Sequence, residues 1–204
     1  MSIITRAKNI LLTPAAEWGV ISMETESPGS LLGKYVLPMS LIPAIATFIG
    51  WGVIGVNVGF VRIGSIEWGL TKGITSFVSS ILTYYVCTYI VDALAPSFGS
   101  EKNIGRSAQL VGYSSTASWV AGIFMILPGL SILSILGLYG IYLFYLGIPV
   151  MKKTPEDKHI GYLLVTALVV IVVFIVIAMI LTSIVYAIMG NPYALGGLND
   201  MRWR

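Results

Sequence analysis

The chain has 204 residues, of which 56% are hydrophobic and only 10% charged, and its mean hydropathy is +0.89. A soluble domain carries about 25% charged residues, so this composition excludes a water-soluble globular protein and indicates an integral membrane protein. The net charge of +3 is small for a nucleic-acid binder, and the single cysteine, Cys87, excludes a disulfide or a cysteine-based metal site within one chain.

Residues 1–34 are expected to form a cytoplasmic, amphipathic N-terminal region. No signal peptide is expected, because only three apolar residues follow Arg6 and Lys8 before Thr13-Pro14. In Ser2–Leu12 the apolar side chains share one helical face, which is typical of a helix in the lipid headgroup region with its cations near anionic lipid. The alternative is a frayed tail that packs on the membrane domain.

Two further short features precede the membrane domain. Thr13–Trp18 predicts a second helix start, although it lacks the acid at the third helical position that completes a capping box. Met23–Ser30 is polar and contains Pro28-Gly29, so we expect a loop there.

Five apolar runs are each long enough to cross the hydrocarbon layer as a helix, which takes roughly 20 residues. The runs are continuously apolar rather than alternating, which favours helices over a barrel. They are about Tyr35–Val58, Ile74–Ala95, Ser107–Leu127, Leu130–Met151 and Ile160–Met189. The sequence therefore predicts an all-α polytopic bundle of five transmembrane helices over residues 35–189. Because Leu127-Pro128-Gly129 allows only a tight hairpin, the third and fourth spans should be antiparallel neighbours.

The basic residues indicate how this bundle is oriented. An odd number of spans places the termini on opposite sides of the membrane. Eight of the twelve basic residues fall on the N-terminal side: Arg6, Lys8, Lys34, Lys102, Arg106, Lys152, Lys153 and Lys158. The positive-inside rule then predicts a cytoplasmic N-terminus and a short extracytoplasmic tail, residues 190–204.

Asp92 is the only acid inside an apolar run, near the cytoplasmic end of the second span. A charge at the centre of the hydrocarbon costs about 2.5–3.5 kcal/mol on insertion scales. Arg106 and Lys102 lie across a short loop, so an ion pair with one of them is expected to clamp two helix ends. A proton or ion relay is the alternative, but no second intramembrane acid or histidine continues one.

The third span is the most polar. Ser114, Ser118 and Gly122 form a small-xxx-small ridge on one helical face, which predicts close helix packing, with a substrate-lined cavity as the alternative. Gly55-x-x-x-Gly59, at the end of the first span, is a weak signal of a dimer face.

Tyrosines recur at every third position of the fourth span, and more lie in the second span, including Tyr84, Tyr85 and Tyr89. They are expected to make interhelix hydrogen bonds, and a polar groove between spans two, three and four is the alternative. The candidate polar cluster is Asp92, Arg106, Gln109, Tyr113, Tyr139, Tyr142 and Tyr145.

The fifth span is apolar on every face, so we expect it to pack at the periphery and meet lipid. The only histidine, His159, lies beside Lys158 at a membrane boundary, and no zinc-protease, serine-hydrolase or Walker motif is present. We therefore expect no catalytic residue, no metal ion and no cofactor.

Three segments carry a resemblance to a known family: Ala95–Gly99, Gly112–Ser114 and Leu138–Lys158, whose Gly-x-Pro-Val-x-x-Lys-Thr-Pro-x-x-Lys ending is the most specific. They resemble the YIP family, five-span membrane proteins named for interacting with Ypt/Rab GTPases, and the match over Leu12 to Met189 looks like its bacterial branch. The resemblance implies a bacterial inner-membrane location and a non-enzymatic role. Rab-type GTPase binding is not carried over, because the D-L-Y-G-P motif before the first span is missing.

Two hypotheses about function follow. The first is a non-enzymatic membrane organiser, adaptor or scaffold that acts on the lipid bilayer and associates through its helices with itself or with other membrane proteins. The alternative is transport of a small solute or ion, or lipid scrambling, through a polar groove between spans two, three and four.

Overall fold

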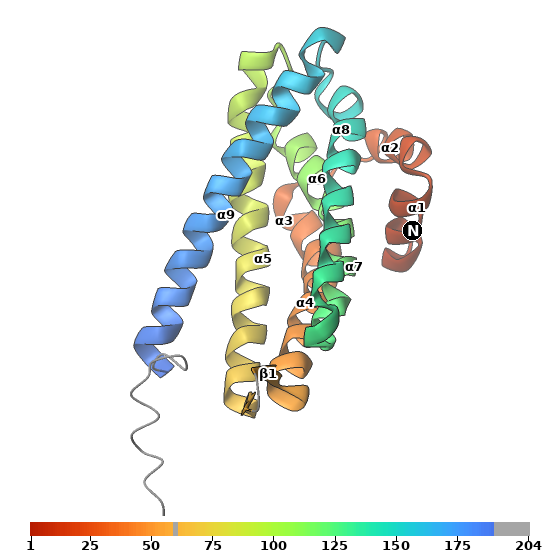
Figure 1. The fold of residues 1–204 in the computed structure, drawn as a ribbon. Coiled ribbons are helices and arrows are strands. Elements are labelled where there is room, and N and C mark those ends of the chain that lie inside the picture. The colour runs from red at the N-terminus through yellow and green to blue at the C-terminus, as the bar shows by residue number, and fades with distance from the viewer. Residues whose placement is uncertain (59–60, 190–204) are drawn as a thin grey trace, which may run out of the picture.

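Long helices run side by side along one axis, and short helical turns and one small hairpin close the ends of the bundle (Figure 1). The computed structural model describes residues 1–58 and 61–189, and the predicted C-terminal tail lies outside this range. The described part is helical apart from the two-stranded hairpin, so the predicted all-α membrane bundle is confirmed.

The first membrane helix is continuous from Pro28 to Ile54. It consists of α3 (Pro28–Leu31), a π-helical segment η1 (Leu32–Val36), α4 (Leu37–Phe48) and a second π-helical segment η2 (Ile49–Ile54). The expected loop therefore ends earlier than Ser30, because Ser27 caps the helix by accepting a hydrogen bond from the Ser30 amide and Pro28 occupies the first turn.

The helix ends at Gly55, whose φ of 75° lies in the region that favours glycine. The chain then enters strand β1 (Val56–Val58), which pairs antiparallel with β2 (Val61–Ile63). The Gly55-x-x-x-Gly59 prediction is therefore wrong as a helical dimer face, since Gly55 terminates the helix; Gly59 itself lies outside the described residues.

The second span is α5 (Ile66–Leu94), which continues into η3 (Ala95–Phe98). The last is α9 (His159–Met189), preceded by η6 (Glu156–Lys158). Only 6% of the α9 window is buried, and Figure 1 shows α9 along one side of the bundle beside α5. The expected peripheral position is confirmed.

Between these helices, the third predicted span is not one helix but three pieces: α6 (Ile104–Ser114), α7 (Thr116–Ala121) and η4 (Gly122–Ile126). At the first break the Ser115 hydroxyl donates to the carbonyl of Val111 (2.8 Å), a type of bond that is associated with bent helices. Four helices among the described residues are long and apolar enough to cross a membrane, so the count of five spans is supported only approximately.

The third segment turns back at Leu127, and η5 (Pro128–Leu138) and α8 (Tyr139–Lys152) return beside it, as the hairpin prediction requires. Two residues of the small-residue ridge, Ser114 and Ser118, lie in this seam, whereas Gly122 packs against Pro43 of α4. The Ser118 hydroxyl donates to the carbonyl of Gly137 (3.2 Å), and a Cβ added to Gly140 would lie 2.8 Å from the carbonyl oxygen of Ser114. This supports close packing within one chain.

The N-terminal segment forms two helices, α1 (Ile3–Leu12) and α2 (Pro14–Ser22), and the predicted second helix start is confirmed. Figure 1 shows both beside the bundle, next to α7 and α8, rather than beyond its end. Ile10, Trp18 and Ile21 belong to the same buried core as the membrane helices. The N-terminal pair is therefore part of the folded bundle and not a frayed tail.

Candidate functional site

The predicted cluster separates into three places, and α6 divides two of them. Its residues Arg106, Gln109 and Tyr113 face the N-terminal helices, whereas Ser107 faces Asp92 of α5 and Lys152 of α8. The tyrosines of α8 lie elsewhere, on its outer surface. Each place has its own chemistry.

The first place, here called the Lys152 cluster, consists of Asp92, Ser107 and Lys152. The ammonium of Lys152 is fully buried and donates to Ser107 Oγ (2.7 Å), to Asp92 Oδ1 (3.2 Å) and to the carbonyl of Asn103 (3.4 Å). Ser107 also donates to Asp92 Oδ1 (3.0 Å). All three donors of a lysine ammonium are thereby used.

This arrangement joins the ends of α5, α6 and α8. The predicted ion-pair partners of Asp92, Arg106 and Lys102, are wrong, because the partner is Lys152. A buried charge is tolerated only when it is paired and hydrogen-bonded, and both conditions are met here. The geometry is that of a clamp between helix ends.

Arg106 and Gln109 hold the end of α2 instead. Arg106 Nη1 and Gln109 Nε2 both donate to the carbonyl of Glu24, at 3.1 and 3.0 Å. Both also donate to the carbonyl of Ile21, in the last turn of α2, at 3.4 and 3.5 Å. The two side chains therefore satisfy the polar end of a helix against the bundle.

The second place, here called the Arg6 network, lies between α1, α2 and α6. Arg6 is buried, donates to Glu17 Oε1 (2.5 Å) and to Glu24 Oε1, and lies over the Tyr113 ring at 5.4 Å. Asn9 donates to the other oxygen of Glu17 (3.0 Å). Burial acts to lower the pKa of Arg6, but its bond to Glu24 and the nearby acids outweigh burial and raise that pKa.

This network corrects the expectation for the N-terminal helix. The cation of Arg6 faces the protein rather than anionic lipid, because two carboxylates and an aromatic face compensate it there. Of the two cations of α1, Arg6 and Lys8, only Lys8 is exposed.

Trp18 fixes α2 on α8. Its indole N–H donates to the carbonyl of Leu143 (3.0 Å), and its ring lies beside Gly147. A Cβ added to Gly147 would lie 2.5 Å from Leu110 Cδ1 and 2.8 Å from Trp18 Cε2. The glycine thus permits the close approach of α2, α6 and α8.

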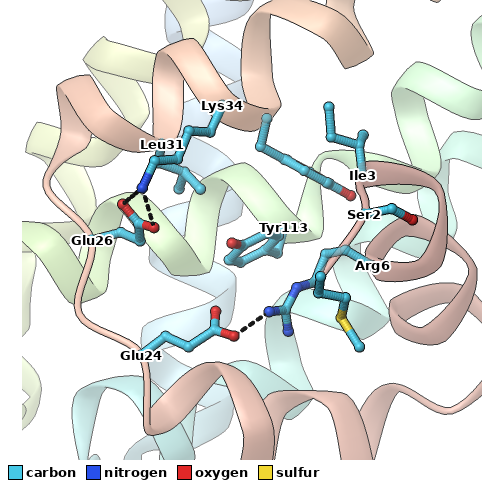
Figure 2. A pocket seen from close by; sticks show the side chains of 10 residues that line it. Ser2, Ile3, Arg6, Glu24, Glu26, Leu31, Lys34 and Tyr113 are labelled. Atoms are coloured by element: carbon cyan, nitrogen blue, oxygen red, sulfur yellow. Dashed lines mark hydrogen bonds and ion pairs between the residues drawn. The ribbon is translucent and has the colours of Figure 1, made fainter.

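A pocket of about 240 Å³ opens beside the Arg6 network. Figure 2 shows Tyr113 at its centre, with Glu26 and Lys34 on one side and Arg6 and Ser2 on the other. We call it the N-terminal pocket; its lining is Met1, Ser2, Ile3, Arg6, Glu24, Glu26, Leu31, Lys34, Tyr35 and Tyr113.

Glu26 is the acid on the Lys34 side of this pocket. Its carboxylate accepts from the Ser30 hydroxyl and from Lys34 Nζ (3.1 Å). The hydrogen bond from Ser30, supported by Lys34 and opposed by burial, lowers the pKa of Glu26. The carboxylate therefore stays charged at neutral pH.

The third place is the tyrosine stripe. Tyr139 and Tyr142 are exposed, with ring centroids 5.4 Å apart, and the Tyr139 hydroxyl donates to the carbonyl of Leu11 (3.1 Å). Tyr145 makes an edge contact with His159, and Tyr84 of α5 is buried with its hydroxyl on the carbonyl of Pro28 (3.0 Å). These side chains do not converge on one groove.

Sequence reasoning missed Lys152 as a buried residue and missed Arg6, Glu17 and Glu24 as a network. A signal for Lys152 existed, because it continues the buried face of α8 four residues after Ile148. The Arg6 network had no such signal, since it depends on the turn between α1 and α2. Within the described residues, no group of three or more His, Cys, Asp or Glu side chains could hold a metal ion.

Comparison with known proteins places the chain among membrane proteins. The family model described as the Yip1 domain matches residues 8–195. The chain is 24% identical over 155 residues to a protein named inner membrane protein YohC from Escherichia coli strain K12, covering 73% of this chain and 80% of that protein. The protein of the same name from Escherichia coli O6:H1 gives the same values. No solved structure matches.

Proposed function

Because the chain belongs to the Yip1 domain family, we propose that it is a non-enzymatic membrane-organising protein of the bacterial inner membrane, and that α1 and α2 act as a wedge in one leaflet. The related protein from Escherichia coli is named as an inner membrane protein, which supports this location. The positive-inside asymmetry makes the leaflet the cytoplasmic one.

The observation that carries the proposal is the position of the N-terminal pair along the bundle. Its contacts run from Tyr139, midway along the Gly129–Lys152 helix, through Leu143 to Gly147 near that helix's end. The pair therefore adds protein volume mainly beside the half of the bundle that contains Lys152. Ile4 and Leu12 are 81% and 69% exposed and present apolar surface outward. A body that is wider in one leaflet favours curved membrane.

The small-residue ridge that was expected to support self-association is not available for it. The ridge of Ser114 and Ser118 is used inside the chain, against Gly140 and Gly137. Helix α9 is the least buried of the four candidate spans and offers a surface for association with a second copy or with another membrane protein. Such association is part of the proposed function.

A curvature-sorting experiment tests the wedge. Labelled protein is reconstituted in giant vesicles, thin tethers are pulled, and protein density is compared between tether and vesicle. We expect enrichment on one sign of curvature, and loss of it in Ile4→Asp/Leu12→Asp. The control, Ile4→Leu/Leu12→Ile, should sort as the parent does. Equal density on tether and vesicle for the parent protein contradicts the proposal.

Transport or lipid scrambling is the second candidate, and one observation favours it. The hydroxyls of Thr83, Thr88 and Ser114 are buried on α5 and α6 without a hydrogen-bond partner among the described residues. Liposome flux and lipid-scrambling assays of the parent, Asp92→Asn and Tyr142→Phe test it. Activity that both changes leave intact would remove the route through spans two to four.

A further inference from the structure

We propose that the N-terminal pocket binds an aminophospholipid headgroup, in which a primary ammonium is joined to a phosphodiester. This inference does not depend on the wedge, because the pocket would recognise the headgroup whether or not the bilayer is bent. Four features of the described residues lead to it: charge, open acceptors, aromatic lining and size.

The pocket carries both signs of charge. Its lining contains two carboxylates, of Glu24 and Glu26, and two side-chain cations, of Arg6 and Lys34. Such a lining suits a zwitterion better than a ligand with a single charge.

The open acceptor for an ammonium is on Glu24. One of its oxygens accepts from Arg6, and within the described residues its second oxygen, Oε2, accepts no hydrogen bond. The side chain is partly exposed toward the pocket, so an ammonium can reach it. A primary ammonium offers three donors and suits such an acceptor, whereas a quaternary ammonium offers none.

Lys34 would bind the phosphodiester end of the ligand. Its side chain is 69% exposed on the rim of the pocket, and it forms an ion pair with Glu26. An exposed ammonium beside a carboxylate can hold a phosphodiester while the carboxylate holds the amine. The two ends of a zwitterionic headgroup thus have matched partners.

The lining also fits the body of such a ligand. The rings of Tyr35 and Tyr113 lie 4.8 Å apart and form an aromatic wall, with Arg6 already over the Tyr113 ring, and Leu31 and Ile3 supply apolar wall. The volume of about 240 Å³ suits a headgroup rather than a folded partner. Lys34 and Leu31 belong to the first membrane helix, so the pocket lies where lipids are the neighbouring molecules.

Native mass spectrometry of the purified full-length chain tests the proposal. The probes are phosphatidylethanolamine, phosphatidylcholine and phosphatidylglycerol with identical acyl chains, together with soluble phosphoethanolamine and inorganic phosphate. We expect the ethanolamine lipid to bind about tenfold more tightly than the other two lipids, since one charge-assisted hydrogen bond is worth roughly that ratio. Competition by soluble phosphoethanolamine would identify the headgroup alone as sufficient, and its failure would show that the acyl chains are needed too.

Matched variants localise the binding. Glu24→Gln keeps an acceptor for Arg6 but removes the charge, and it should abolish the preference for ethanolamine. Lys34→Gln, on the exposed rim, provides a second variant that does not disturb the buried network. Glu101→Gln, an exposed acid paired with Lys153 outside the pocket, should bind as the parent does. Equal binding of all three lipids, equal binding of inorganic phosphate, or equal effects of Glu24→Gln and Glu101→Gln would overturn the proposal.

Discussion

The indole N–H of Trp18 donates to the carbonyl oxygen of Leu143 across 3.0 Å, although 125 residues separate the two in the chain. Through this bond, and through the contact of the Trp18 ring with Gly147, the N-terminal helices become part of the membrane bundle. The position of α1 and α2 is therefore set by specific contacts and not by general attraction to lipid.

Gly147→Ala should loosen this seam. The added Cβ would lie within 2.8 Å of the Trp18 ring and 2.5 Å of Leu110, and overpacking of this kind costs about 1–3 kcal/mol. Thermal unfolding in detergent measures the loss. Gly19→Ala, on α2 itself, is the matched control, because its Cβ would meet no atom within 4 Å, and it should leave stability unchanged or raise it slightly. Equal effects of the two changes would contradict the docking.

Lys152→Met should be far more damaging than a change at the neighbouring lysine. It leaves the buried carboxylate of Asp92 without its cation, and breaking a buried pair from one side costs about 3–5 kcal/mol. Lys153→Met removes an exposed pair with Glu101, which is worth about 0–1 kcal/mol.

The double change Asp92→Asn/Lys152→Met distinguishes a lost pair from lost packing. If the pair is the cause, the second change should recover part of the stability lost in Lys152→Met, because no unpaired charge remains. Additive losses in the double variant would argue against the clamp.

Glu26 predicts a pH dependence. Its pKa is lowered in the folded protein, mainly by the hydrogen bond from Ser30, so its stabilising contribution is present above its ordinary pKa and is lost as pH falls through the lowered value. The melting temperature of the parent minus that of Glu26→Gln should be positive at pH 7 and shrink in acid below about pH 4.3. A difference that stays constant from pH 7 to pH 3 would show that Glu26 does not contribute through its charge.

The sequence predicted the membrane helices because continuous apolar runs reflect burial in lipid. The antiparallel hairpin at Leu127 followed from a turn too short for anything else. The first span begins and ends earlier than predicted, because local features set its ends: the cap at Ser27 and the positive φ of Gly55. The pattern of hydrophobic residues does not reveal such features.

The candidate site was predicted less well, because side chains find partners through the tertiary fold. Asp92 was expected to pair with a cation across the nearest loop, but the fold brings Lys152 of α8 next to it instead. Arg6 appeared as a cation for the lipid surface, and only the turn at Thr13 brings Glu17 and Glu24 back to it. Charge type was readable from the sequence, whereas the partner of each charge was not.

The most direct test of the account is the membrane depth of α1. Single spin labels are placed at Ile4, Lys8 and Leu12 in a Cys87→Ala background in liposomes, and their collisions with dissolved oxygen and with a water-soluble nickel complex are compared. We predict that labels at Ile4 and Leu12 favour oxygen, as lipid-exposed positions do, because both side chains are exposed and apolar. Labels at both positions that collide mainly with the nickel complex would place α1 in water and contradict the wedge.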